Sequence, residues 1–186
     1  ETHVKTDRDG NAVVVMDSRR ISKKTGMFKQ CQSNFICFNG LALIEDMQQN
    51  LHAADLQNAE IGDVKQFGYT VIDGELKAER NGKDNWYDIV GVIHSLPERA
   101  EQLMASNEFD VKYMVFDCMF FDGKDIRDMP YEYRYACAKA IVSALHSVCD
   151  KIQLGENAFA KDKADAYAIR DEYVEKGYEG IVMKSF

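Results

Sequence analysis

Gly68-Tyr69-Thr70-Val71-Ile72-Asp73-Gly74-Glu75-Leu76 is the stretch that decides the fold. Its alternation predicts a strand, in which Asp73 and Glu75 project from one face together with Val71. Two acids on an otherwise buried strand cost free energy unless they have a partner or a function. Gly74 between them lacks a side chain, so a ligand or another backbone can approach closely there. Two interpretations follow: two oxygen ligands at the floor of a polar pocket, or an ordinary strand that ends in an Asp-Gly turn.

The composition is that of an ordinary globular chain. Of its 186 residues, 46% are apolar and 29% are charged, which is enough for a substantial core. We find no internal repeat or linker and treat residues 1–186 as a single domain. No apolar run approaches the roughly 20 residues of a membrane-spanning helix, so we expect no membrane partner. The net charge of −8 argues against a stand-alone nucleic-acid clamp but allows a catalytic domain with one basic face.

The five cysteines are odd in number and include no Cys-x-x-Cys pair. They predict free thiols, not a disulfide framework or a zinc site. We therefore expect a reducing compartment.

Patterns of apolar residues and turn residues predict the remaining elements. We expect strands at residues 2–7, 12–17, 87–94, 111–122, 151–155 and 179–184, and helices at residues 40–54, 96–106, 131–149 and 161–176. The central strand should continue to a turn at Asn81-Gly82, residues 122–125 should form a second turn, and Gly177 should end the last helix. One face of the strand at 111–122 is expected to carry Met114, Phe116, Cys118 and Phe120.

A basic segment, Ser18-Arg19-Arg20-Ile21-Ser22-Lys23-Lys24, follows the first predicted hairpin. Its positive charges suit an anion, and arginine can bind phosphate through two hydrogen bonds. A solvated charged turn is the alternative that stays open.

Three short motifs follow one another along the chain. They are Asp73-Gly74-Glu75-Leu76, Phe116-Asp117 and Glu179-Gly180-Ile181-Val182-Met183-Lys184. In order and separation they resemble motifs III, IIIa and IV of the covalent nucleotidyltransferases, which comprise DNA ligases, RNA ligases and mRNA capping enzymes. The sequences look most like an ATP-dependent DNA ligase of the viral or phage type, and Ser18-Arg19 then resembles motif Ia of that family.

The resemblance implies an adenylation domain that uses ATP and Mg²⁺ and acts, as a monomer, on nicked duplex DNA. It also implies the cytoplasm of a bacterium or of a virus-infected host cell. In that family the lysine of a Lys-x-Asp-Gly motif attacks the α-phosphate of ATP. The AMP then passes to the 5′-phosphate at the nick, and the 3′-hydroxyl displaces it.

The resemblance also implies roles for single residues. Arg19 would contact the ribose and the nick phosphate, and Glu75 would hold a ribose hydroxyl or help to place the metal. Glu179 would be the carboxylate of the metal site, which agrees with the one or two carboxylates that Mg²⁺ usually takes. Phe116 would stack on adenine, as a flat aromatic ring can, and the nucleotide-binding set would be completed by Ile181 or Met183 on the other face of the base and by Lys184.

The chain departs from the family pattern in one respect, because it contains no Lys-x-Asp-Gly. The nearest sequence is Lys5-Thr6-Asp7-Arg8-Asp9-Gly10, where Arg8 stands in the place of the glycine, so Lys5 is only a weak candidate for the nucleophile. We interpret this segment as the hairpin after motif I. We expect motif I upstream of Glu1, and motif V and a small OB-type domain beyond Phe186. The expectation is an internal fragment that forms no enzyme–AMP adduct by itself.

The expected fold class is α+β, with two mainly antiparallel sheets, flanking helices and a nucleotide cleft between the sheets, as in ligase adenylation or ATP-grasp-like domains. Glu75, Phe116 and Glu179 are expected to face that cleft. Four alternatives stay open: an RNA ligase, a capping guanylyltransferase that transfers GMP, an inactive nucleotide-binding domain of ligase ancestry, and an unrelated α+β domain.

Overall fold

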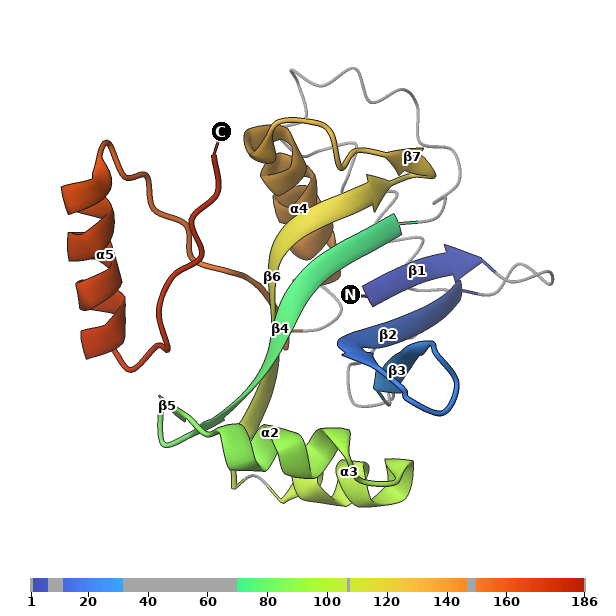
Figure 1. Cartoon of the computed structure of the whole chain (residues 1–186). Helices are drawn as coiled ribbons and strands as arrows, with labels where there is room; N and C mark the ends of the chain where they lie inside the picture. The colour runs from blue at the N-terminus through green and yellow to red at the C-terminus, as the bar shows by residue number, and fades with distance from the viewer. Residues whose placement is uncertain (1, 7–11, 32–69, 107, 147–149, 186) are drawn as a thin grey trace.

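The computed structural model describes residues 2–6, 12–31, 70–106, 108–146 and 150–185 (Figure 1). The strands are β1 (Thr2–Thr6), β2 (Ala12–Ile21), β3 (Phe28–Cys31), β4 (Thr70–Arg80), β5 (Lys83–Asp84), β6 (Asp110–Phe121), β7 (Lys124–Asp125) and β8 (Ile152–Leu154). The helices are α2 (Trp86–Ile93), α3 (Pro97–Ala105), α4 (Tyr131–His146) and α5 (Lys163–Glu175). The predicted helix at 40–54 and the predicted turn at 7–11 lie outside the described residues. Within those ranges, every helix is too short or too polar to cross a membrane.

The eight described strands form a single sheet in the order β3-β2-β1-β4-β6-β7, with β5 added to β4 and β8 added to β6 (Figure 1). The β6–β8 pair is parallel, and the other described pairs are antiparallel. The predicted division into two sheets is therefore wrong for the described part of the chain. The reason is that β1 pairs with β4, from Thr2 opposite Ile72 to Val4 opposite Thr70, so the first hairpin joins the central ladder. The α+β class itself is confirmed.

The central pair, β4 with β6, is bounded by two tight turns. Asn81 and Gly82 have φ values of 54° and 73°, and Asp122 and Gly123 have values of 49° and 76°. Positive φ at both central residues defines the turn that best matches the twist of a hairpin, and Asn-Gly and Asp-Gly favour it. Both predicted turns are confirmed.

Residues 86–93 form helix α2, so the strand predicted at 87–94 is wrong. Asn85 caps the helix, since its side-chain oxygen accepts a hydrogen bond from the backbone N–H of Tyr87 at 3.1 Å. Ile89 and Val92 are buried and lie three residues apart, on one face of the helix. Their β-branched side chains suggested a strand, but the packing of one helical face overrides that weak preference.

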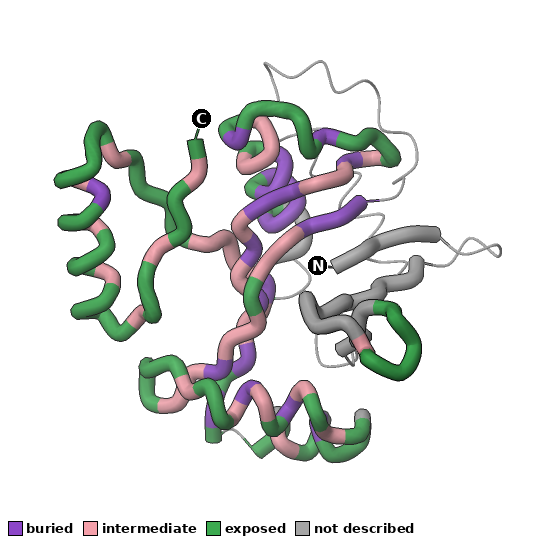
Figure 2. Tube along the Cα trace, in the orientation of Figure 1, coloured by how far each residue is buried: buried purple, intermediate pink, exposed green. Residues whose placement is uncertain are grey.

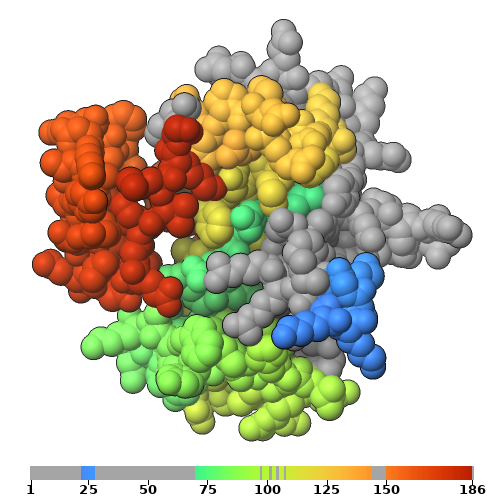
Figure 3. All heavy atoms as spheres, in the orientation of Figure 1, coloured from blue at the N-terminus to red at the C-terminus, as the bar shows by residue number. Residues whose placement is uncertain are grey.

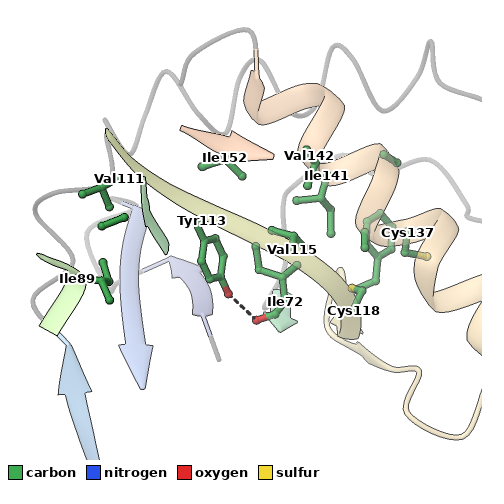
Figure 4. Close-up of a cluster of buried hydrophobic side chains, with 14 of the residues drawn as sticks. Ile72, Ile89, Val111, Tyr113, Val115, Cys118, Cys137, Ile141, Val142 and Ile152 are labelled. Carbon is green, nitrogen blue, oxygen red and sulfur yellow. Dashed lines mark hydrogen bonds between the residues drawn. The ribbon is translucent and has the colours of Figure 1, made fainter. Parts of the chain in front are cut away.

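Helix α4 and strand β8 complete the core on one side of β6. Figure 4 shows Val115 and Cys118 of β6 beside Ile141 and Cys137 of α4, all in one cluster of buried side chains. Figure 2 shows buried residues along β4, β6 and α4, whereas Ala166 is the buried residue of α5. Helix α5 therefore projects from the sheet, and the core lies between the β4–β6 pair and helices α2, α3 and α4. The predicted helices α3, α4 and α5 and the predicted strands β6 and β8 are confirmed within a few residues.

Candidate functional site

Phe116 is the extra residue of an irregularity in β6. The register passes from Gly74 opposite Val115 to Asp73 opposite Asp117, which leaves Phe116 without an opposite residue. Such bulges re-aim side chains and are frequent beside active sites. The expectation that Phe116 and Cys118 share a face is wrong for this reason: Cys118 is fully buried in the core, whereas Phe116 is only half-buried.

The Asp117 carboxylate next to this irregularity is buried and accepts hydrogen bonds from two cationic side chains. Arg134 of α4 donates from Nε to Oδ1 at 2.9 Å and from Nη2 to Oδ2 at 3.2 Å. Lys184 donates from Nζ to Oδ2 at 2.5 Å, although it lies 67 residues further along the chain. Burial alone would raise the pKa of Asp117, but the hydrogen bonds and charges of Arg134 and Lys184 outweigh it and lower the pKa. The folded protein therefore favours the ionised form of the Asp117 carboxylate.

Lys184 also lies over two aromatic rings. Its Nζ is 5.3 Å from the centre of the Phe116 ring and 4.7 Å from the centre of the Tyr131 ring. The Tyr131 hydroxyl donates to the backbone oxygen of Phe116 at 3.0 Å. A cation at these distances from an aromatic face is attracted by the ring. The structure thus brings the end of the third motif to the second motif. Figure 3 shows the C-terminal segment in dark red beside helix α5, which is drawn in orange.

The C-terminal segment, residues 178–185, forms no strand, so the strand predicted at 179–184 is wrong. On one edge of β4, β1 pairs with residues 70–72 and β5 with residues 79–80, and no described strand pairs with residues 73–78 on that edge. The C-terminal segment contacts the sheet through side chains instead of a backbone ladder. The segment starts where Gly177, with φ of 95°, ends α5: Gly177 N–H donates to Val174 and Tyr178 N–H donates to Tyr173, which is a Schellman cap. The Tyr178 ring then lies 4.4 Å from Nζ of Lys77 on β4.

Glu75 and Glu179, the two predicted metal carboxylates, are both exposed. Glu75 shares a face of β4 with Lys77, two residues on, and Lys77 contacts the residue that precedes Glu179. Among the described residues no group of three or more His, Cys, Asp or Glu side chains could hold a metal. Two carboxylates fit Mg²⁺ when phosphate oxygens and water supply the other ligands, so these residues suit a metal that arrives with a nucleotide.

The other predicted residues are placed as follows. Ile181 is half-buried and Met183 is exposed, both within the C-terminal segment. Arg19 belongs to β2 and Lys5 to β1, and the structure describes the backbone course of these strands. The side chains of Arg19 and Lys5 lie outside the described part.

Gly74 allows the neighbouring strand β6 to pack closely against β4. A β-carbon added there would lie 2.6 Å from the backbone oxygen of Met114 and 2.8 Å from the ring of Tyr113. The close approach expected at this glycine is therefore that of a neighbouring strand and its core tyrosine. β4 continues to Arg80, so the Asp-Gly pair does not end the strand.

Arg134 and Tyr131 were missed by the sequence reasoning. They lie three residues apart on the first turn of α4, and three residues apart means one helical face. A tyrosine and an arginine on one face of the helix that follows the Phe-Asp strand were the available signal. The buried acid on that strand required a cationic partner, which the sequence did not identify.

Residues 12–186 match the family described as "ATP dependent DNA ligase domain". DNA ligase 1 of Korarchaeum cryptofilum (strain OPF8) is 24% identical over 117 residues, which are 63% of this chain and 20% of that protein. A DNA ligase of Thermoplasma volcanium is 29% identical over 80 residues, which are 43% of this chain and 13% of that protein. The matched part therefore spans a fifth or less of either relative.

Proposed function

Because the chain belongs to the ATP dependent DNA ligase domain family, we propose that it is the nucleotide-binding part of an enzyme that seals nicks in duplex DNA. The observation that carries the proposal is the contact of Lys184 with Phe116 and Asp117, which unites two of the three motifs at one place on the sheet. The family match removes the alternative of an unrelated α+β domain.

In the proposed site the Phe116 ring stacks on one face of adenine. The bulge supports this role, since it turns Phe116 out of the regular alternation while the core face of β6 stays packed. Ile181 or Met183 covers the other face of the base, and Glu75 binds a ribose hydroxyl. Arg19 contacts the ribose and the phosphate at the nick.

Glu75 and Glu179 are the proposed carboxylates for Mg²⁺, which would neutralise phosphate charge in the transfer. Both are exposed, as ligands that meet a metal–nucleotide complex must be. The cleft expected for the nucleotide, the nicked duplex and the monomeric state belong to the same proposal.

The chemistry of the proposed enzyme also needs a nucleophilic lysine. The 186 residues contain no Lys-x-Asp-Gly, so we propose that this chain by itself binds the nucleotide without forming a lysyl-AMP. AMP is therefore the appropriate probe for the chain alone.

Calorimetric titration of the chain with AMP and with GMP tests the proposal. We expect AMP to bind more tightly than GMP, and Phe116→Ala to weaken AMP binding about tenfold, because stacking of a base on an aromatic ring contributes about 1–3 kcal/mol. Phe159→Ala is the matched control, since Phe159 is 70% exposed and belongs to no motif. Tighter binding of GMP than of AMP would favour the guanylyltransferase alternative. An equal loss of AMP affinity in Phe116→Ala and Phe159→Ala would refute stacking on Phe116.

A further inference from the structure

We propose that Asp117 and Arg134 are positioning residues, which hold Lys184 and thereby dock the C-terminal segment, residues 178–185, on the Phe116 irregularity. Neither residue has a role in the nucleotide site described above. The inference deepens the proposed function and rests on it, because the docked segment contains Ile181, Met183 and Glu179.

The first step is the fixed orientation of the Asp117 carboxylate. Oδ1 accepts from Nε of Arg134 at 2.9 Å and from the backbone N–H of Cys118 at 2.8 Å. With Oδ1 held by these two donors, Oδ2 is directed at Lys184. A carboxylate held by an arginine fork has less freedom than one held by a lysine alone.

The second step is the fixed orientation of Arg134 itself. Its Nη1 donates to the backbone oxygens of Met129 at 2.7 Å and Arg127 at 3.3 Å, in the loop that leads into α4. The guanidinium therefore joins β6 to the start of α4. Tyr131, on the same helical turn, binds the backbone oxygen of Phe116. These contacts restrict the orientation of the carboxylate, since they join a central strand to the helix that packs on it.

The third step is the dependence of the C-terminal segment on this contact. Residues 178–185 form no strand, and most of them are exposed. Side-chain contacts at its two ends attach it to the sheet: Tyr178 on Lys77, and Lys184 on Asp117, Phe116 and Tyr131. The Lys184 contact is the stronger of the two, because it joins opposite charges at a buried carboxylate that is 7% exposed.

Acylation of lysines with an N-hydroxysuccinimide ester, read by mass spectrometry without any nucleotide, tests the docking directly. Asp117→Asn keeps the size of the side chain and removes its charge. We expect Lys184 to react about tenfold faster in this variant, because a hydrogen bond between charged groups contributes about that factor or more. Asp110→Asn is the matched control: it removes the exposed partner of Lys151, at 3.1 Å, and should raise the reactivity of Lys151 while leaving Lys184 unchanged.

A second variant covers the case in which Asp117→Asn does not fold. Lys184→Met leaves the Asp117–Arg134 pair in place, and we expect faster backbone hydrogen exchange in residues 178–185 with unchanged exchange in β6. Unchanged exchange in the segment would overturn the inference, as would unchanged Lys184 reactivity in a folded Asp117→Asn protein. If Lys184 had a purely structural role, Lys184→Met would lower the melting temperature and leave backbone hydrogen exchange in residues 178–185 unchanged.

The nucleotide then separates this inference from the proposed function. If the inference and the proposed function both hold, Asp117→Asn weakens AMP binding about tenfold and Asp110→Asn does not. If the unaltered chain binds no AMP, the proposed function fails, and the acylation and exchange results still decide whether Asp117 and Arg134 dock the segment.

Discussion

Asp117 shows how one side chain can connect distant parts of a chain. It lies on β6, and its partners come from α4 and from the C-terminal segment. A buried ion pair is costly when one partner is removed, since an uncompensated charge remains. The carboxylate is therefore a point at which folding and the proposed site depend on the same contacts.

The lowered pKa of Asp117 predicts a specific dependence of stability on pH. Since the pKa in the folded chain is below its ordinary value of 3.8, the unfolded chain binds the proton more tightly. The stabilisation is thus present above about pH 4 and is lost as the pH falls through the lower folded value. Urea unfolding at a series of pH values should show a flatter acid limb for Asp117→Asn. Arg134, Lys184 and Tyr131 are the groups that face the carboxylate. Asp110→Asn serves as the control, because it removes a carboxylate from an exposed ion pair, which contributes little to stability. Parallel acid limbs for the unaltered chain and Asp117→Asn would contradict this account.

Gly74 gives a second prediction at the residue scale. Gly74→Ala places a methyl group against the backbone of Met114 and the buried Tyr113 ring, and we expect a loss of about 2–4 kcal/mol in the free energy of unfolding. Gly91→Ala is the matched control, since no atom lies within 4 Å of a β-carbon there. That change in helix α2 should be neutral or stabilise by up to about 1 kcal/mol. Equal effects of the two substitutions in chemical denaturation would show that Gly74 is not packed as described.

At the scale of elements, patterns that specify local geometry predicted the structure well. The Asn81-Gly82 and Asp122-Gly123 turns, the 131–146 helix and the Gly177 stop follow from backbone preferences that act within a few residues. Helix α2 was mistaken for a strand, because its valines and isoleucines favour strands, and the packing of Ile89 and Val92 on one helical face overrides that preference. The final motif was mistaken for a strand, because its apolar alternation is a local pattern, whereas a strand also needs backbone pairing with a partner, which no local pattern specifies.

The cap of α5 allows a test of how the C-terminal segment is directed. Gly177 has a φ of 95°, which costs other residues about 1–2 kcal/mol. We expect Gly177→Ala to increase hydrogen exchange at the end of α5 and in the first residues after it. Gly177→Asn should have a smaller effect, since asparagine tolerates positive φ better than alanine does. Identical exchange in the two variants would mean that the left-handed conformation at this position is not required.

At the scale of the whole molecule, the sheet brings together motifs that are far apart in the sequence. The pairing of β4 with β6 places the first two motifs on neighbouring strands, and α5 carries the chain back so that the third motif reaches the second. The sequence order suggested this convergence through resemblance alone, and the roles of Glu75, Phe116 and Glu179 remain predictions. The Arg134 contact could not be predicted, because it depends on how α4 packs across β6. The single sheet depends in the same way on the pairing of β1 with β4.

Backbone hydrogen exchange of this chain with and without saturating AMP tests the central claim most directly. If the three motifs bind one adenylate, AMP should slow exchange together in residues 72–76 of β4, in residues 114–118 of β6 and in residues 178–185, while α2 and α3 exchange as before. Protection confined to one of these segments, or spread evenly over the chain, would contradict the claim that they form a single nucleotide site.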